Sequence, residues 1–153
     1  MNRTIGAAIA IAALAIAPSA AQAAPEDFTS GSAWFECQQD CGAHVSWTGH
    51  GTPADARGQA HIIQPYYNLN SKATVDCVKV DGNRATISGR VEEPPAGSDG
   101  EYYAIQVEDN GPGRLDRVSV GYIFRPIDCT FGNEFPPTFE ASRGNAEVKD
   151  RTP

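Results

Sequence analysis

The chain has 153 residues and carries 19 acidic residues against 12 basic ones, a net charge of −7. An acidic chain without a basic cluster repels nucleic acid and anionic membranes, so we expect neither as a partner. Its length predicts a single domain.

The N-terminus has the features of a secretory signal. Arg3 precedes an apolar run of Ala, Ile and Leu over residues 5–17, and the small residues at 21–23 fit a signal peptidase site. The run is too short to span about 30 Å of hydrocarbon as a helix. We therefore expect residues 1–23 to be cleaved, with the mature protein secreted into the extracellular space and without a membrane span; an uncleaved anchor is the alternative. Cleavage would change the net charge from −7 to −8, because it removes Arg3 and no acid.

All four cysteines follow that segment, at Cys37, Cys41, Cys77 and Cys129. An even number in a short exported chain predicts disulfides, with three possible connectivities. We favour Cys37–Cys41, which closes a small loop, and Cys77–Cys129, which ties the middle of the domain to the end of its last long strand. A zinc site is the alternative, although the spacing lacks a paired C-x-x-C.

The sequence that follows the signal predicts a series of β-strands. Apolar residues recur at every second position in 84–92, 103–107 and 118–124, which is typical of half-buried antiparallel strands. Shorter strands are expected at 33–36, 44–50, 58–64, 77–80 and 146–149, and Asp81-Gly82-Asn83 predicts a tight hairpin. We therefore expect an N-terminal segment over 24–43 with the Cys37–Cys41 loop, and an all-β domain over 44–153. Seven or eight antiparallel strands in a meander favour a small, disulfide-stapled β-barrel, with a β-sandwich as the alternative.

Three stretches carry a resemblance to a known group of proteins. Residues 82–91 read GN-x-A-x-I-x-G-x-V, residues 107–119 contain V-x-DNG followed by D-x-V-S, and residues 144–150 read GN-x-x-V-x-D. Together they resemble uncharacterised small secreted bacterial β-proteins, over most of the chain from Val45 to Asp150. The resemblance implies an all-β fold. It brings no catalytic or ligand residues with it.

The candidates for catalysis are few. The sequence has no G-x-S-x-G motif, and cysteines in disulfides offer no nucleophile. His44, His50 and His61 with Ser46 and either Asp40 or Asp55 could form a Ser/His/Asp site, but their spacing does not single them out. We therefore expect no catalytic residues and no enzyme, with a small secreted hydrolase as a rival interpretation.

Two groups of residues in the sequence could bind a metal ion. Asp109, Asn110 and Asp116 could offer oxygen ligands to calcium, although their spacing excludes an EF-hand. The alternative is that these side chains hydrogen-bond their own turn, with Gly111 supplying a positive φ. The three histidines could bind zinc or copper if their strands met. We expect no cofactor, with calcium as the candidate exception.

Aromatic residues suggest a binding role. Trp47 lies on a predicted strand, and Tyr66 and Tyr67 are adjacent in a loop, where rings flanked by Asn and Gln could stack on sugars. The alternative is that Trp47 fills the core and the tyrosines cover its rim. We predict a secreted non-enzymatic β-domain that binds an unidentified extracellular ligand or protein, or serves as a cell-envelope component; a carbohydrate-binding module is the alternative within this class.

Overall fold

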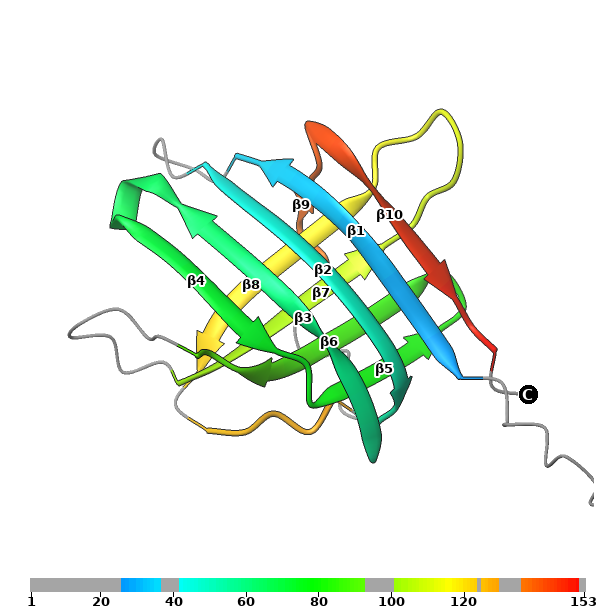
Figure 1. The fold of residues 1–153 in the computed structure, drawn as a ribbon. Helices are drawn as coiled ribbons and strands as arrows, with labels where there is room; N and C mark the ends of the chain where they lie inside the picture. The colour runs from blue at the N-terminus through cyan, green and yellow to red at the C-terminus, as the bar shows by residue number, and fades with distance from the viewer. Residues whose placement is uncertain (1–25, 37–41, 93–100, 124, 130–135, 152–153) are drawn as a thin grey trace, which may run out of the picture.

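The protein is a β-sandwich of two five-stranded antiparallel sheets. The computed structural model describes residues 26–36, 42–92, 101–123, 125–129 and 136–151. Sheet A has the order β10-β1-β2-β3-β4 and sheet B the order β5-β6-β7-β8-β9. In Figure 1 the strands of sheet A run across those of sheet B, the arrangement of an orthogonal sandwich. The expected all-β antiparallel meander is thereby confirmed.

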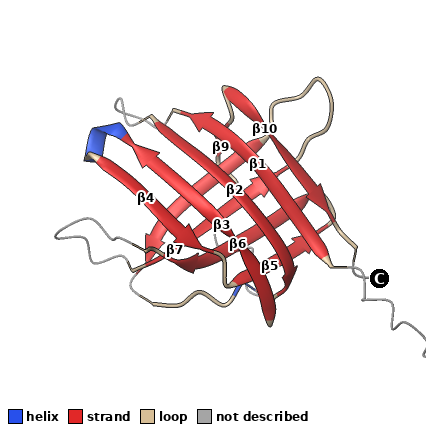
Figure 2. Ribbon diagram, in the orientation of Figure 1, coloured by secondary structure: helices blue, strands red, loops and turns tan. Residues whose placement is uncertain are grey.

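The strands come in the order in which the chain pairs them, and Figure 2 shows them together with the short helical turn η1 between β3 and β4. Their bounds are β1 Asp27–Phe35, β2 Ala43–Thr52, β3 Asp55–Gln64, η1 Pro65–Tyr67, β4 Leu69–Thr74, β5 Cys77–Asp81, β6 Arg84–Arg90, β7 Tyr102–Glu108, β8 Arg117–Ile123, β9 Phe139–Glu140 and β10 Arg143–Lys149.

Two expectations about the architecture need correction. The described residues form ten strands rather than seven or eight, and the two sheets do not close into a barrel, so the sandwich alternative holds. Where the chain passes from β4 to β5, a single isolated bridge, Ala73 to Val91, links the sheets. At the opposite edges of the sheets, β10 and β9 are not paired with each other in the described part of the chain. Closure of a barrel needs a continuous ladder at both places.

The domain begins earlier than residue 44. β1 lies within the residues expected to form a separate N-terminal segment, and it pairs along its whole length with β2 and also with β10. Its inward side chains include Asp27 and Thr29, so apolar alternation does not reveal the strand. Cys37 and Cys41 lie outside the described residues, and their pairing stays a prediction, as does the signal peptide at 1–23.

Alternating side chains from the two sheets meet in one core. Its largest buried members include Trp47 from β2, Ile62 from β3, Ile87 from β6 and Ile105 from β7. Tyr103 is also fully buried, and its hydroxyl donates a hydrogen bond of 3.0 Å to the Thr74 carbonyl at the end of β4. Burial raises the pKa of Tyr103 far above its ordinary value, so the hydroxyl keeps its proton and the link between the sheets.

The outer face of sheet B is covered by the connection between β8 and β9. Thr86, Ser88 and Gln106 point away from the core, yet they are buried. Ser88 donates a hydrogen bond of 3.1 Å to the Ile127 carbonyl, and the Ser119 hydroxyl donates to the Pro136 carbonyl at 3.2 Å. The covering segment is therefore hydrogen-bonded to β6 and also to β8.

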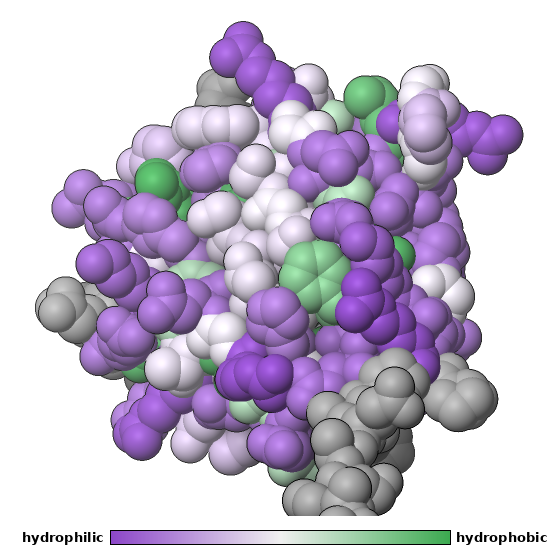
Figure 3. All heavy atoms as spheres, turned by 45° about the vertical axis from the view of Figure 1, so that its right-hand side comes forward, coloured by the Kyte–Doolittle hydropathy of each residue, from purple (hydrophilic) through white to green (hydrophobic). Residues whose placement is uncertain are grey.

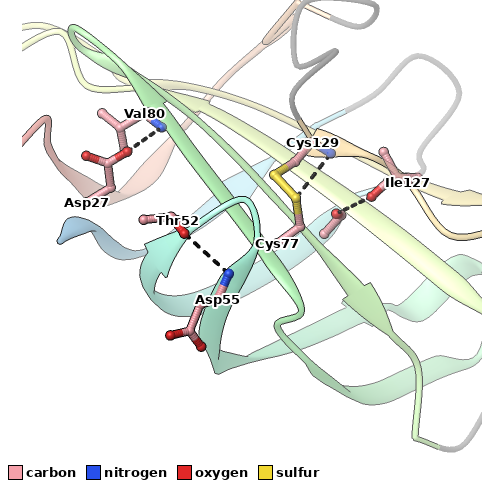
Figure 4. Close-up of a disulfide and its surroundings, with 8 residues drawn as sticks. Asp27, Thr52, Asp55, Cys77, Val80, Ile127 and Cys129 are labelled. Carbon is pink, nitrogen blue, oxygen red and sulfur yellow. Dashed lines mark hydrogen bonds between the residues drawn. A yellow bond between two sulfur atoms is a disulfide. The ribbon is translucent and has the colours of Figure 1, made fainter. Parts of the chain in front are cut away.

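A disulfide fixes this covering segment. Cys77 at the start of β5 is bonded to Cys129, with the two Cα atoms 5.8 Å apart (Figure 4), which confirms the predicted pairing. The Cys129 amide also donates to the Cys77 sulfur at 3.2 Å. In the chain-entropy model, a closed loop of this size stabilises the fold by about 4 kcal/mol.

Carboxylates cap the outer edge of β10. This strand pairs with β1 on one side only, so alternate amides face away from the sheet. Asp116 accepts from the Ala146 amide at 2.7 Å, and Asp109 accepts from the Val148 amide at 3.3 Å. Figure 1 shows the connection between β7 and β8, which carries both aspartates, beside β10. An edge that would otherwise be open to strand addition is thereby occupied.

A second group of carboxylates ties the two sheets near the chain's C-terminal end. Asp27, only 3% exposed, accepts from the Val80 amide of β5 at 3.3 Å and from the Arg151 amide at 3.2 Å. Asp150 accepts from the Gly82 amide in the β5–β6 turn at 3.2 Å. Sheet A is thus bonded to sheet B through aspartate side chains as well as through the core.

Replacing Asp116 with Ala should destabilise the protein substantially. The carboxylate accepts two amides, from Ala146 and from Asn110, and bonds to a charged group contribute roughly 1.5–3 kcal/mol each. We expect a loss of about 3 kcal/mol in the free energy of unfolding by urea. Asp116→Asn, which keeps one acceptor oxygen, should lose less. Asp55→Ala in the exposed β2–β3 turn is the control and should change stability by no more than about 0.5 kcal/mol. Equal losses for Asp116→Ala and Asp55→Ala would contradict the capping role.

Candidate functional site

The outer face of sheet A is the candidate site. Residues of β1, β2 and β3 alternate between the core and this face because successive strand residues point to opposite sides. The outward side chains of these three strands together form the outer face. They are Phe28, Ser30, Ser32, Trp34, His44, Ser46, Thr48, His50, Arg57, Gln59, His61 and Ile63.

Two ring pairs stand at the ends of the β1–β2 ladder. Trp34 lies opposite His44, and their rings stack with centroids 4.8 Å apart and planes inclined by 22°. Six residues back along β1, Phe28 lies opposite His50 with ring centroids 4.9 Å apart. Trp34 is 43% exposed, a large fraction for a tryptophan. Apolar ring surface is therefore presented to solvent at one end of the ladder.

Between the ring pairs lies a floor of hydroxyl groups. Ser32 pairs with Ser46, and Ser30 pairs with Thr48. None of these four hydroxyls hydrogen-bonds another of the residues that the structure describes. Each hydroxyl can donate one hydrogen bond and accept two. The floor therefore offers both donors and acceptors to a molecule lying over it.

A shallow groove runs from Ser30 across β2 and β3 toward β4, and neither ring pair lines it. Its lining includes Ser30, Ser46, Thr48, Gln59 and His61, and it ends at Lys72 and Glu92. The short side chains of β1 and β2 lie lower than the long polar side chains of Gln59, His61 and Lys72, which gives the sheet surface its hollow. The groove is polar, and its two charged lining residues have opposite sign.

The histidines of the outer face contact rings or an amide. His61 lies across from Ser46 on β2, and one ring nitrogen is 2.6 Å from the Asn70 side-chain oxygen on β4. Because a carbonyl oxygen only accepts, that nitrogen carries a hydrogen. Partial burial and the nearby His61 both lower the pKa of His44. The imidazole of His44 is therefore uncharged at neutral pH.

The two cations beside the Phe28–His50 pair have acidic neighbours, whereas Arg143, opposite Trp34 on β10, forms no ion pair with another described residue. Lys149 lies 5.5 Å from the centre of the Phe28 ring and pairs with Glu147 at 2.5 Å. Arg57 pairs with Glu26 at 2.6 Å, and this contact lowers the pKa of the Glu26 carboxyl. Exposed pairs of this kind add little stability, but they leave this part of the surface without a strong charge of either sign. Figure 3 shows a side of the molecule on which hydrophobic residues stand singly among hydrophilic ones.

The aromatic residues singled out from the sequence are not brought together on the surface. Trp47 is 3% exposed, and its ring N–H donates to the buried Thr29 hydroxyl at 3.0 Å, so it fills the core. Tyr66 is 66% exposed in η1, while the side chain of Tyr67 lies outside the described part of the structure. Trp47 therefore cannot share a stacking surface with Tyr66.

The predicted calcium ligands make hydrogen bonds to the backbone. Asp109 accepts from the Gly111 amide at 2.9 Å, Asp116 accepts from the Asn110 amide at 2.9 Å, and Asn110 donates to the Leu115 carbonyl at 2.9 Å. These are turn bonds, and the outer oxygens of both aspartates accept amides of β10. Within the described residues no three His, Cys, Asp or Glu side chains form a metal-ligating group. A calcium-binding role for this loop stays a prediction.

Ser46 and the three histidines considered for catalysis lie on the same outer face. Ser46 and His61 are cross-strand neighbours, and His61 contacts Asn70. No hydrogen bond joins the Ser46 hydroxyl to His61 within the described part of the chain. Asp55 lies at the exposed β2–β3 turn, and Asp40 lies outside the described residues.

Sequence reasoning missed the two ring-bearing residues of β1. The sequence predicts a short strand at 33–36 that contains Trp34, and no strand that contains Phe28. The available signal was the alternation Phe28, Ser30, Ser32, Trp34, which matches the outward row of β2. It was hidden because the inward residues Asp27, Thr29 and Gly31 are polar or small.

Comparison of the chain with protein-family models, with curated proteins and with solved structures found no significant match. The outer face is therefore interpreted from its own geometry.

The two tryptophans should behave oppositely when replaced with Phe. Trp47→Phe should cost about 2 kcal/mol of unfolding free energy, because it removes buried ring area and the bond to Thr29. Trp34→Phe should change stability by no more than about 0.5 kcal/mol. Each variant leaves one tryptophan, so iodide should quench the emission of Trp47→Phe strongly and that of Trp34→Phe weakly. The reverse order of quenching would show that the inward and outward assignments of β1 and β2 are wrong.

His44 should titrate below its ordinary pKa of 6.5. Burial and the nearby His61 both disfavour the protonated form of His44, so the unfolded chain binds this proton more readily than the folded protein does. The free energy of unfolding should therefore fall as the pH drops below 6.5. An NMR titration of the ring protons should give a midpoint below that value. His61→Asn should raise the midpoint because it removes the like charge. A midpoint at or above 6.5 in the wild type would contradict the packing described for His44.

Proposed function

We propose that this protein is a secreted, non-enzymatic β-sandwich domain that binds an extracellular ligand on the outer face of sheet A. The observation that supports this most strongly is the β1–β2 ladder, in which four hydroxyls without a hydrogen bond to another described residue lie between two ring pairs. Its partner would be an extracellular ligand without strong charge, because the cations beside the Phe28–His50 pair are already matched by Glu26 and Glu147.

The composition of the outer face supports a binding role over a merely solvated one. The centre of the sheet carries Ser and Thr, whose short side chains line a groove that runs toward β4. Trp34 also keeps a large exposed ring surface, although stacking on His44 covers part of it. Exposed tryptophan is enriched where proteins bind partners.

Secretion is supported by the disulfide between Cys77 and Cys129, because such bonds persist in oxidising compartments. The apolar N-terminal segment provides the expected signal. In the described part of the chain no helix is long and apolar enough to cross a membrane.

A small hydrolase is the second candidate, and one observation favours it. Ser46, His61 and Asn70 lie on three adjacent strands, with His61 in contact with the Asn70 oxygen. A hydrolase would need Ser46 to approach the free ring nitrogen of His61 when substrate binds. The binding proposal instead leaves all three as polar contacts to a ligand that is not altered.

A thermal-shift screen followed by NMR tests the binding role. The oxidised mature protein is screened against neutral oligosaccharides, acidic oligosaccharides, peptides and short-chain lipids, since a ligand that binds only the folded state raises the melting temperature. For each hit, we expect the perturbed amides to lie in β1, β2 and β3 and the probe to be recovered unchanged by mass spectrometry. Perturbed amides elsewhere, a chemically altered probe, or no hit in the panel would each contradict the proposal.

A further inference from the structure

We propose that the outer face of sheet A binds a linear chain of neutral sugar residues, lying along β1 and β2 with one end stacked on Trp34. This inference rests on the proposed binding function and names the class of its ligand.

The spacing of the ring pairs calls for an extended ligand. Trp34 and Phe28 are on the same side of β1 and six residues apart, which corresponds to about 20 Å along a strand. A molecule of metabolite size could contact only one ring pair. A short oligosaccharide can reach from the Trp34–His44 pair to the Phe28–His50 pair.

The floor between the rings matches the chemistry of sugars. Sugar hydroxyls both donate and accept hydrogen bonds, and so do the hydroxyls of Ser30, Ser32, Ser46 and Thr48. Gln59, at the groove's side, adds an amide with both a donor and an acceptor. The flat apolar faces of sugar rings stack on aromatic side chains, for which Trp34 offers its exposed surface.

Around the Phe28–His50 pair and along the groove the charge distribution favours neutral over anionic sugars, whereas at the Trp34 end Arg143 of β10 is a cation without an ion pair to another described residue. Lys149 and Arg57, which flank the Phe28–His50 pair, are already paired with Glu147 and Glu26. At the other side of the groove Lys72 is accompanied by Glu92. The chain as a whole is acidic, so it would repel a polyanion at long range.

A peptide ligand fits the molecule less well. Extended peptides commonly add a strand to an open sheet edge, where backbone hydrogen bonds supply the affinity. At the β10 edge the Ala146 and Val148 amides already donate to Asp116 and Asp109. The outer face itself presents side chains, whereas the backbone groups of β1, β2 and β3 are used in the sheet.

Calorimetric titration with defined sugars tests the inference. The oxidised protein is titrated with cellohexaose, xylohexaose, chitohexaose and maltohexaose, and with the corresponding disaccharides. We expect at least one neutral hexasaccharide to bind, at least tenfold more tightly than its disaccharide, because only the longer chain reaches both ring pairs. Trp34→Ala should weaken that binding at least tenfold, and Thr48→Val should weaken it by a smaller factor.

Tyr66→Ala is the matched control, since Tyr66 is an exposed ring in η1 away from β1 and β2. It should leave the affinity unchanged, and unchanged melting temperatures should show that the Trp34 and Thr48 variants are folded. Oligomers of alginate, a peptide mixture and a short-chain lipid are titrated in parallel.

The outcomes separate this inference from the binding function. Binding of a neutral hexasaccharide that depends on Trp34 supports both. Binding of alginate, peptide or lipid alone, with perturbed amides on β1, β2 and β3, overturns the sugar inference and keeps the binding function. Neutral-sugar binding that is insensitive to Trp34→Ala overturns the site. No binding of any probe overturns both.

Discussion

The capping of β10 by Asp116 and Asp109 is the interaction on which the arrangement of sheet A depends. β10 comes from the end of the chain and pairs with β1, close to its start. Its outward amides at Ala146 and Val148 would lack protein partners if the connection between β7 and β8 did not supply two carboxylates. Since buried or half-buried amides need acceptors, these bonds fix β10 in place and with it the position of β1 inside the sheet.

The register of β1 then determines what the outer face presents. With Thr29 and Gly31 turned inward, Phe28, Ser30, Ser32 and Trp34 must turn outward. Trp47 makes this register specific, because its ring lies against Gly31. A Cβ atom at Gly31 would come within 2.8 Å of that ring and 2.3 Å of the Asn145 carbonyl, so only glycine fits. A shift by one residue would exchange the inward and outward rows, placing Asp27 and Thr29 on the surface and the rings in the core.

Much of the fold could be predicted from the sequence because short-range rules control it. Period-two alternation predicts β6, β7 and β8, and the Asp81-Gly82-Asn83 turn predicts the β5–β6 hairpin. The even cysteine count predicts disulfides with three connectivities, of which the favoured Cys77–Cys129 pair is present. Other features depend on contacts between distant residues. β4 was missed because its alternation combines Leu69 and Ala73 with a buried Ser71, and Trp47 could not be assigned to the core without knowing that Gly31 makes room for it. The sequence predicts, as the alternative to calcium binding, that Asp109 and Asp116 hydrogen-bond their own turn. Their bonds to β10 could not be predicted, because they join residues 30 and 39 positions apart. The two ring pairs on the outer face could not be predicted from the sequence, since they require the pairing of β1 with β2.

The most direct measurement is amide hydrogen exchange at Ala146 and Val148 in the wild type and in Asp116→Asn. If the carboxylates cap the edge, both amides are protected in the wild type although they face away from β1, and exchange at Ala146 becomes faster in the variant. Wild-type amides that exchange as fast as the Ala54 amide in the exposed β2–β3 turn would contradict the capping of β10, and with it the account of how the outer face is held in position.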